Sequence, residues 1–319
     1  MNFNEYFTDF QDKTIVEIVD LIKNKIGPSD YPVIITGQSG TGKDFFAYLI
    51  HFYSKRKDKP FIRIDCPNLL DQLAASELLG HEKGAFTDAR EQKTGKLELA
   101  DEGTVYFDLI DTLPLGLQNK ISPVFEKESF TRLGGIEEMD FKARIIASSQ
   151  SDLMDKIRER KFKPELYYLL NIIGIKLPPL KQRKADILPL ADYFLNQAAL
   201  KLNIPKKTLT REAKKWCLEY SWPGNIRQLK NAIERVCLSI SSPKIEKQDF
   251  LFLLDGQEDF IKEAGERKLT LKEMENLYIS YILKLTRGNK TKAAKLLDIS
   301  RKTLIEKLKK LAVQHSQIK

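Results

Sequence analysis

Cysteine and histidine are both scarce in this chain, which contains three of each among 319 residues. Cys66, Cys217 and Cys237 lie far apart and lack the close spacing of metal ligands or of a disulfide framework. We therefore expect them to be buried free thiols. The histidines are equally scattered, so the sequence predicts no metal cage of His and Cys.

Long apolar runs are also missing. No stretch of about 18 uncharged apolar residues occurs, as a membrane-spanning helix would need, and the acidic, polar start lacks the basic-then-apolar order of a signal peptide. Charged residues make up 30% of the chain and hydrophobic residues 42%, a balance typical of soluble globular proteins. These features predict a cytoplasmic protein without a membrane partner.

Positive charge is concentrated at the C-terminal end. Residues 265–319 carry 14 Lys and Arg against 5 Asp and Glu, a surplus equal to the net charge of +9 for the whole chain. A basic terminus can be no more than a solvated end of the chain. Here, however, the basic residues belong to a segment with the pattern of a folded helical unit, which favours a polyanion as its partner.

Short apolar runs alternate with helical segments over much of the first 180 residues. The runs are Val33–Thr36, Phe61–Asp65, Val105–Asp108, Arg144–Ser149 and Ile172–Leu177. This alternation predicts an α/β domain of three layers, in which helices cover both faces of a mostly parallel sheet. One amphipathic helix precedes the first run, and because it accounts for those residues we expect no separate sensory domain in front of it.

The pattern divides the chain into four segments. Residues 1–183 form the α/β domain, and residues 184–254 form a second segment in which we expect helices only from about residue 186 to residue 253. Residues 255–268 are polar and charged, which is typical of a linker. Residues 269–319 form a small all-α unit.

A phosphate-binding loop follows the first run. It consists of Gly37, Gln38, Ser39, Gly40, Thr41, Gly42 and Lys43, and a helix is predicted from Asp44 onward. Glycines let backbone amides turn toward phosphate oxygens, the helix N-terminus adds a positive dipole end, and Lys43 reaches the outer phosphates. A glycine-rich turn without a ligand is the alternative, but the strand before and the helix after favour a P-loop that binds ATP.

Two carboxylates are candidate ligands of Mg²⁺. Asp44 stands where many P-loops have a Ser or Thr hydroxyl on the metal, and a carboxylate can replace that hydroxyl directly or through water. Asp108 ends the run Val105–Asp108, a position that suits a Walker B aspartate. A surface Asp often follows a buried strand without any function. The place of Asp108 after the P-loop and before the run Arg144–Ser149 nevertheless favours a metal site.

Several strings resemble one family. The longest is Gly80-His81-Glu82-Lys83-Gly84-Ala85-Phe86-Thr87-Asp88-Ala89, and the others are Leu166-Tyr167-Tyr168, Leu177-Pro178-Pro179-Leu180 and Trp222-Pro223-Gly224-Asn225-Ile226-Arg227. Over roughly residues 14–255 they resemble, in order and spacing, the central domain of sigma-54-dependent activators, the bacterial enhancer-binding proteins of the AAA+ class. The resemblance implies an α-helical lid, a homo-oligomer between a dimer and a hexameric ring, and contact with the sigma-54 RNA polymerase holoenzyme.

The same resemblance assigns roles to individual residues. It makes Arg227 the sensor II arginine that reaches the nucleotide from the lid. The GAFTGA-like loop that touches the sigma factor comprises Gly84, Ala85, Phe86, Thr87, Asp88 and Ala89. Asp88 replaces a glycine of the family, but aspartate tolerates turn geometry better than most residues, so a folded loop is compatible with it.

The catalytic positions depart from the family pattern. Leu109 stands where the family has its catalytic carboxylate, Asp65 replaces the partner asparagine, and Lys163 and Leu169 occupy the positions of arginine fingers. Leucine cannot orient or deprotonate water, and a missing arginine finger costs ~10³–10⁵ in rate. We expect ATP to bind and hydrolysis to be slow or absent, with Asp108, a relocated base Asp65 and a partial substitute Lys163 as the catalytic candidates.

The basic C-terminal unit has the pattern of three helices. Leu271–Leu285 is expected to bury Tyr278 and Ile282, Thr291–Leu297 follows, and Ser300 suits the N-cap of the last helix. That helix exposes Arg301, Lys302, Thr303, Glu306, Lys307 and Lys310. Residues 288–311 resemble the Fis-type helix-turn-helix, which implies dimeric binding in the major groove of DNA; a basic bundle for protein contact is the alternative.

Two functions compete at this point. One is a sigma-54-type regulator that binds ATP and sequence-specific DNA, which the loop around Phe86 favours. The other is a hydrolysis-deficient AAA+ scaffold that acts as a DNA-binding regulator or repressor with ATP as a structural ligand, which the missing carboxylate and arginines favour. A P-loop ATPase outside transcription, such as a remodelling chaperone, explains neither the loop nor the basic terminus.

Overall fold

A computed structural model describes residues 9–69, 71–254, 269–286, 289–305 and 307–308 of the chain. They form two compact units, Met1–Lys244 and Ile245–Lys319, which are described separately. The predicted linker 255–268 and the DNA-contact candidates Glu306 and Lys310 lie outside the described residues.

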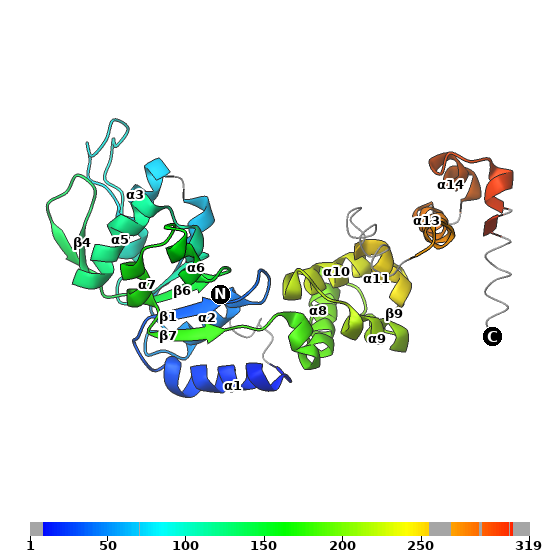
Figure 1. Ribbon diagram of the computed structural model, residues 1–319, viewed down its shortest axis with the longest axis horizontal. Helices are drawn as coiled ribbons and strands as arrows, with labels where there is room; N and C mark the ends of the chain where they lie inside the picture. Colours follow the sequence, from blue (N-terminus) through cyan, green and yellow to red (C-terminus); the bar gives the residue numbers. More distant parts are fainter. Residues whose placement is uncertain (1–8, 70, 255–268, 287–288, 306, 309–319) are drawn as a thin grey trace. The chain divides into compact units, whose positions relative to one another are not determined.

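A five-stranded parallel sheet lies at the centre of the first unit (Figure 1). Its order is β2-β3-β6-β1-β7, with bounds Phe61–Asp65, Thr104–Asp108, Arg144–Ser149, Val33–Thr36 and Ile173–Lys176. The prediction of a parallel α/β sheet is therefore confirmed, and each predicted run matches a strand within one residue. Because all strand pairs are parallel, the carboxyl ends of β1, β3 and β6 lie at one edge of the sheet.

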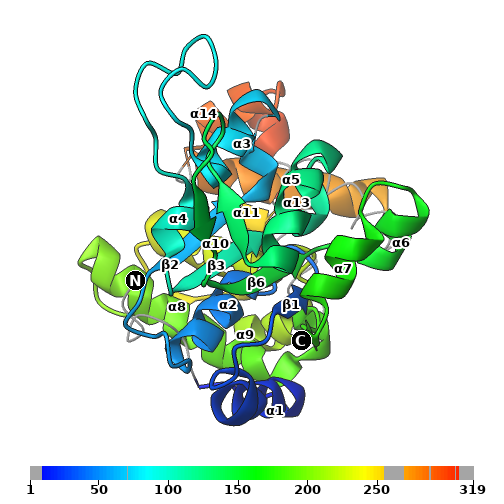
Figure 2. The same ribbon diagram turned by 90° about the vertical axis from the view of Figure 1, so that its left-hand side faces the viewer.

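Helices cover both faces of the sheet (Figure 2). Side chains alternate between the faces, so that Val33 and Ile35 of β1 pack on one side and Ile34 on the other. The first face is covered by α1 (Lys13–Leu21), the π-helix η2 (Ile22–Ile26) and α2 (Lys43–Phe52). The second face is covered by α3 (Asp71–Leu79), α4 (Lys96–Ala100), α5 (Leu115–Lys127), α6 (Leu153–Arg158) and α7 (Pro164–Leu170).

Short elements connect the layers. They are the 3-10 helices η3 (Cys66–Asn68), η4 (Ile110–Thr112), η5 (Leu180–Gln182) and η6 (Lys184–Asp186), and the antiparallel strands β4 (Ser129–Thr131) and β5 (Glu138–Asp140). The three cysteines are free and buried, as expected. Burial raises the pKa of the Cys217 thiol to about 12.

The lid helices are α8 (Ile187–Leu202), α9 (Arg211–Glu219) and α10 (Asn225–Ser239). The expectation of helices only in this segment was wrong, because β8 (Thr208–Leu209) and β9 (Lys244–Ile245) form a small two-stranded sheet. The chain leaves α8 through Asn203 in a left-handed conformation, and Pro205 cannot donate to a continuing helix. The Thr208 amide then donates to the Pro243 carbonyl at 2.9 Å.

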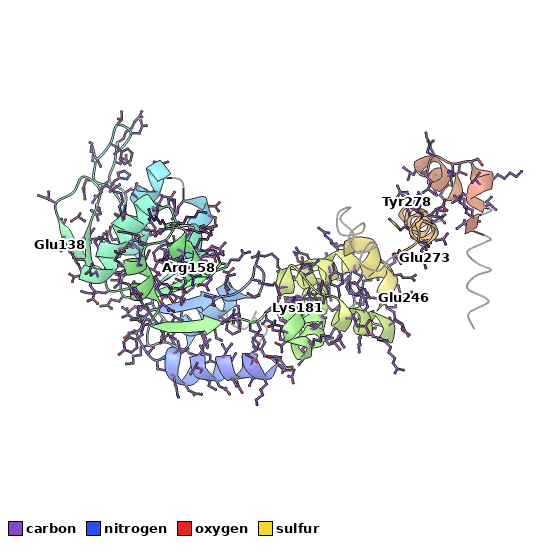
Figure 3. All side chains as sticks on the ribbon, in the orientation of Figure 1. Glu138, Arg158, Lys181, Glu246, Glu273 and Tyr278 are labelled. Carbon is purple, nitrogen blue, oxygen red and sulfur yellow. The ribbon has the colours of Figure 1, made fainter. Side chains whose placement is uncertain are left out.

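The second unit contains α11 (Lys247–Leu254), α13 (Leu271–Leu285), α14 (Lys290–Leu296) and the helical residues 301–305 and 307–308. As expected, the Ser300 hydroxyl caps the last helix by accepting from the Thr303 amide at 3.0 Å. Ile282 is buried as expected, but Tyr278, also expected to be buried, is 50% exposed because the neighbouring Ile279 lies on the buried side of α13 (Figure 3). These isoleucines pack with Leu304 in a small core. Among the described residues, no helix has both the length and the apolar character required to cross a membrane.

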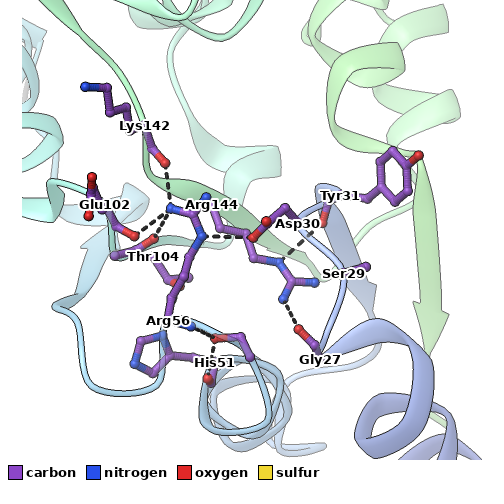
Figure 4. A network of polar contacts seen from close by, with 12 residues as sticks. Gly27, Ser29, Asp30, Tyr31, His51, Arg56, Glu102, Thr104, Lys142 and Arg144 are labelled. Carbon is purple, nitrogen blue, oxygen red and sulfur yellow. Dashed lines mark hydrogen bonds and ion pairs between the residues drawn. The ribbon is translucent and has the colours of Figure 1, made fainter.

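A polar network holds the edge of the sheet at which the parallel strands begin (Figure 4). Arg144, the first residue of β6, is 2% exposed and donates to the carbonyls of Ile26 at 2.7 Å, Gly27 at 2.9 Å and Tyr31 at 3.3 Å. Ile26 and Gly27 close the helix formed by α1 and η2, so the guanidinium satisfies carbonyls at its negative end. Burial lowers the pKa of Arg144 to about 10, which leaves it charged at neutral pH.

We predict that Arg144→Met lowers the free energy of unfolding by about 3 kcal/mol, because buried carbonyls lose their donor. Urea unfolding followed by circular dichroism measures this difference. Arg158→Met is the matched control, since the Arg158 side chain is 75% exposed and pairs with the nearby Asp155 (Figure 3); its effect should stay within about 0.5 kcal/mol. Equal effects of the two substitutions would contradict the structural role of Arg144.

Candidate functional site

The P-loop joins β1 to α2 and depends on two glycines. Gly40 and Gly42 have φ values of +74° and +99°, a region that side chains rarely adopt. The space around Gly40 is also filled, since a Cβ there would lie 2.3 Å from the Gly224 carbonyl oxygen. Both positions therefore require glycine for the turn, and Gly40 requires it also for the close approach of the lid.

The carbonyl oxygens of the P-loop from Gly37 to Thr41 all accept hydrogen bonds. Lys43 Nζ donates to Gly37 at 2.8 Å and to Gln38 at 3.1 Å. The other donors are Asn225 Nδ2 to Ser39 at 2.8 Å, the Ile226 amide to Gly40 at 2.9 Å and Arg183 Nη2 to Thr41 at 2.6 Å. With its carbonyls held in this way, the loop can direct amides toward an anion.

Lys43 lies inside the loop and is only 6% exposed. Burial lowers the pKa of its ammonium group, while the charges of Asp108 and Asp44 act in the opposite direction. Helix α2 begins at Lys43, one residue before the expected start. The helix N-terminus and the ammonium group thus lie together, as an anion site requires.

The lid supplies residues that the sequence reading did not single out. Asn225 is fully buried, donates to Ser39 and accepts from the Leu180 amide at 2.7 Å, so it ties the lid to the loop. The predicted sensor II residue Arg227 lies beside it, with Nη1 3.2 Å from the Ser39 hydroxyl. The only signal for Asn225 was its place in the Trp222–Arg227 string, where it adopts a left-handed conformation that asparagine tolerates.

Arg183 was also missed. It is completely buried beside the P-loop, yet its Nε and Nη1 atoms have no hydrogen-bond partner among the described residues. The Oδ2 atom of buried Asp186 likewise has none, while its Oδ1 accepts from the amides of Gln11 and Asp12. Buried polar atoms without partners are rare in folded proteins, so these groups mark a place that fits the polar atoms of a ligand.

The two predicted metal carboxylates, Asp44 and Asp108, do come together at the carboxyl ends of the strands. Tyr106 Oη lies 2.8 Å from Asp44 Oδ1 and 3.1 Å from Asp108 Oδ1, and Ser148 Oγ donates to Asp108 Oδ1 at 2.8 Å. The sequence reading missed Arg63, which pairs with Asp108 Oδ2 and lies 3.7 Å from Asp44 Oδ2. A cation of the chain itself therefore lies between the two acids.

This pairing decides the charge of Asp108. Burial alone favours its protonated form, but hydrogen bonds from Ser148 and Arg63 outweigh that effect and hold the pKa of the carboxyl below its usual range. Asp108 is thus ionised at neutral pH, and its charge is already compensated by a guanidinium.

The residues at the expected catalytic positions differ in their surroundings. Leu109 adopts a left-handed conformation with φ of 57°, and its amide donates to Ser148 Oγ at 2.9 Å. Asp65 lies beside Asp108 in the strand register, and its carboxylate accepts from Asn68 at 2.7 Å. Lys163 precedes α7, where its amide donates to Gln118. Leu169 packs against the hydrophobic core, so it offers no polar group at a finger position.

The GAFTGA-like loop projects from the second face of the sheet and is drawn in cyan (Figures 1 and 2). Phe86 is 37% exposed, and its ring lies 4.9 Å from that of His81. The turn closes through the Gly84 amide, which donates to the Ala89 carbonyl at 2.8 Å. Asp88 is not among the residues with positive φ, so this turn does not need the glycine that it replaces.

The base of this loop is held by ion pairs. Arg132 donates to Glu82 at 2.8 Å and to Glu98 at 2.6 Å, and the Glu82 amide donates to the Leu133 carbonyl. The base of the loop is thus held by ion pairs, while the Phe86 side chain stays partly accessible.

The predicted DNA-binding helix presents part of its expected set. Arg301 and Lys302 are exposed, whereas Thr303 is half-buried with its hydroxyl 2.8 Å from that of Ser300. Lys307 pairs with Glu275 of α13 at 2.6 Å. Arg301 and Lys302, at the start of this helix, are therefore the described residues best placed to contact a polyanion.

Comparisons with known proteins agree with this layout. Family models match residues 9–176 as a sigma-54 interaction domain, residues 181–265 as an AAA+ ATPase lid domain and residues 270–311 as a bacterial regulatory protein of the Fis family. The transcriptional regulatory protein FlbD of Caulobacter vibrioides is 35% identical over 92% of this chain and 68% of its own length. The regulatory protein AtoC of Escherichia coli is 37% identical over 94% of this chain and 67% of its own length.

A solved structure also resembles the chain. It is the crystal structure of NtrX from Brucella abortus in complex with ADP, which aligns with a TM-score of 0.71 and 28% identity over 96% of this chain and 69% of NtrX. The chain therefore spans about two thirds of the length of these relatives.

Proposed function

This chain belongs to the sigma-54-dependent family of AAA+ transcription regulators, and we propose that its P-loop binds ATP while its Fis-type unit binds sequence-specific DNA. The P-loop carries the proposal. Its carbonyls from Gly37 to Thr41 are held by Lys43, Arg183 and the lid, which suits amides that face a triphosphate. In this proposal Gly37 to Asp44 and Arg227 contact the nucleotide.

Nearby buried groups support a nucleotide rather than a simple anion. Arg183, beside the loop, and Asp186 have polar atoms with no partner among the described residues, and a phosphate alone would not require them. NtrX, which is similar over almost the whole chain, was crystallised with ADP. We infer that the nucleotide extends from the P-loop toward these two residues.

The exposed loop fits contact with the sigma-54 RNA polymerase holoenzyme. A partly exposed aromatic ring on a projecting loop offers apolar area to a partner, and the base of the loop that carries Phe86 is held by Arg132. We place the sigma contact at Gly84 to Ala89. A homo-oligomer would present several such loops to one polymerase.

A second candidate is a scaffold that binds ATP but hydrolyses it slowly or not at all. Leu109 at the position of the catalytic carboxylate favours it, because a buried strand end that carries Asp108 is followed by a side chain without proton-transfer chemistry. Asp65 and Lys163 are the residues left for that chemistry. Such a chain would regulate or repress promoters with ATP as a structural ligand.

We predict that Lys43→Ala weakens binding of a fluorescent ATP analogue about 10- to 100-fold, the effect expected for a charge-assisted hydrogen bond. Titration of the purified full chain measures the affinity. Lys13→Ala is the matched control, since the Lys13 side chain is 91% exposed, and it should bind like the unmodified chain. Unchanged affinity of a folded Lys43→Ala chain would refute the P-loop assignment.

Turnover separates the two candidates. We predict that the unmodified chain releases phosphate at least ~10³-fold more slowly than an active AAA+ ATPase assayed in parallel, as expected without a base and arginine fingers. The assay is run with and without DNA, beside a Leu109→Glu chain and with Lys43→Ala as the blank. A rate near that of the active enzyme would rule out the scaffold.

DNA binding should depend on the start of the last helix. We predict that replacing Arg301 and Lys302 by Ala weakens duplex binding and reduces the slope of log affinity against log salt by about 2, since two phosphate contacts are lost. Fluorescence anisotropy at several salt concentrations measures both quantities. Replacing the exposed pair Lys214 and Lys215 of α9 by Ala changes the net charge equally. If that control has the same effect, the DNA site is not at residues 301–302.

A further inference from the structure

We propose that the Arg63 guanidinium takes the place of the divalent cation beside the phosphates, so that this chain binds nucleotide tightly without magnesium. The proposal rests on the nucleotide site proposed above and deepens it, because it assigns the charge compensation of that site to a residue of the chain.

Arg63 reaches the site because of its strand register. On β2, Ile62 and Ile64 belong to the second face of the sheet, so Arg63 lies on the first face, where α2 carries Asp44. Its register partner on β3 is Tyr106, whose hydroxyl contacts both acids. Its Nη2 atom pairs with Asp108 Oδ2 and lies 3.7 Å from Asp44 Oδ2.

The donor set does not fit magnesium. Mg²⁺ requires near-octahedral oxygen ligands at about 2.0–2.1 Å. Asp108 Oδ1 already accepts from Ser148 and lies near the Tyr106 hydroxyl, and Asp108 Oδ2 binds Arg63. A permanent cation between the two acids also repels a second one.

The guanidinium has donors left for phosphate. It carries five N–H groups in a planar fork, and among the described residues its hydrogen bond to Asp108 uses Nη2 alone. The side chain is 43% exposed, so the protein does not enclose it. Guanidinium groups bind phosphate oxygens through two parallel hydrogen bonds. Asp44 and Asp108 thus orient Arg63 as they would otherwise orient a metal ion.

The test is the magnesium dependence of nucleotide affinity. A fluorescent ATP analogue is titrated into the full chain in EDTA and in millimolar MgCl₂. We expect the unmodified chain to bind equally within about twofold in both buffers, because no metal ion bridges its acids and the phosphates. Arg63→Ala should bind about 10- to 100-fold more weakly in EDTA, the loss expected for charge-assisted hydrogen bonds, and should recover in MgCl₂ because both acids are free.

Two further variants serve as controls for nonspecific effects of substitution. Arg63→Lys keeps the charge and should stay magnesium-independent with a smaller loss of affinity, because lysine lacks the fork. Arg158→Ala changes the net charge equally at an exposed site and should behave like the unmodified chain. Circular dichroism spectra establish that each variant is folded.

The outcomes separate this inference from the function that it builds on. Loss of affinity by tenfold or more when magnesium is removed from the unmodified chain would overturn the role of Arg63 and leave the nucleotide site intact. An Arg63→Ala chain that binds equally in both buffers, with unchanged affinity, would overturn it as well. Absence of binding by the folded, unmodified chain in either buffer would overturn the nucleotide site itself.

Discussion

The conformation of the P-loop is the constraint on which the first unit depends. A loop that offers its amides to phosphate must have its carbonyls satisfied elsewhere, since unpaired buried carbonyls are costly. Here Lys43 does so from the loop itself, Arg183 from the segment after β7, and Asn225 from the lid. The same donors join sheet, connector and lid into one unit, so any change of loop conformation is coupled to the position of the lid residues.

Buried cations on backbone carbonyls recur in this unit. Arg144 closes the end of the first helix at the opposite edge of the sheet, as Lys43 and Arg183 close the P-loop. In each case the cation is desolvated and its pKa is lowered by burial. A charged donor gains more from a carbonyl than a neutral one does, which offsets part of the cost of burial.

The strand ends carry the features behind the proposed slow hydrolysis. Leucine stands at position 109, and the acids Asp44 and Asp108 engage a guanidinium. The residues proposed for contact with partners, namely Phe86, Arg301 and Lys302, are exposed. The proposed function therefore combines exposed contact residues with a nucleotide site that has no base at residue 109.

The sequence by itself determined the parallel sheet, the P-loop and the Ser300 cap, because these depend on local periodicity, on glycines and on capping residues near in the chain. It also indicated that Asp44 and Asp108 lie close together, since Asp108 ends one parallel strand and Asp44 lies in the first turn of the helix that the P-loop joins to another. Only the tertiary structure decided that Arg63 pairs with those acids and that Asn225 joins the lid to the P-loop. It also decided the burial of Arg183 and the small sheet within the lid. Such contacts join residues as many as 187 positions apart, and an arginine in a strand does not reveal which distant carboxylate it will meet. Contacts between residues so far apart in the chain depend on how the layers pack, and neither composition nor hydrophobic periodicity encodes that packing.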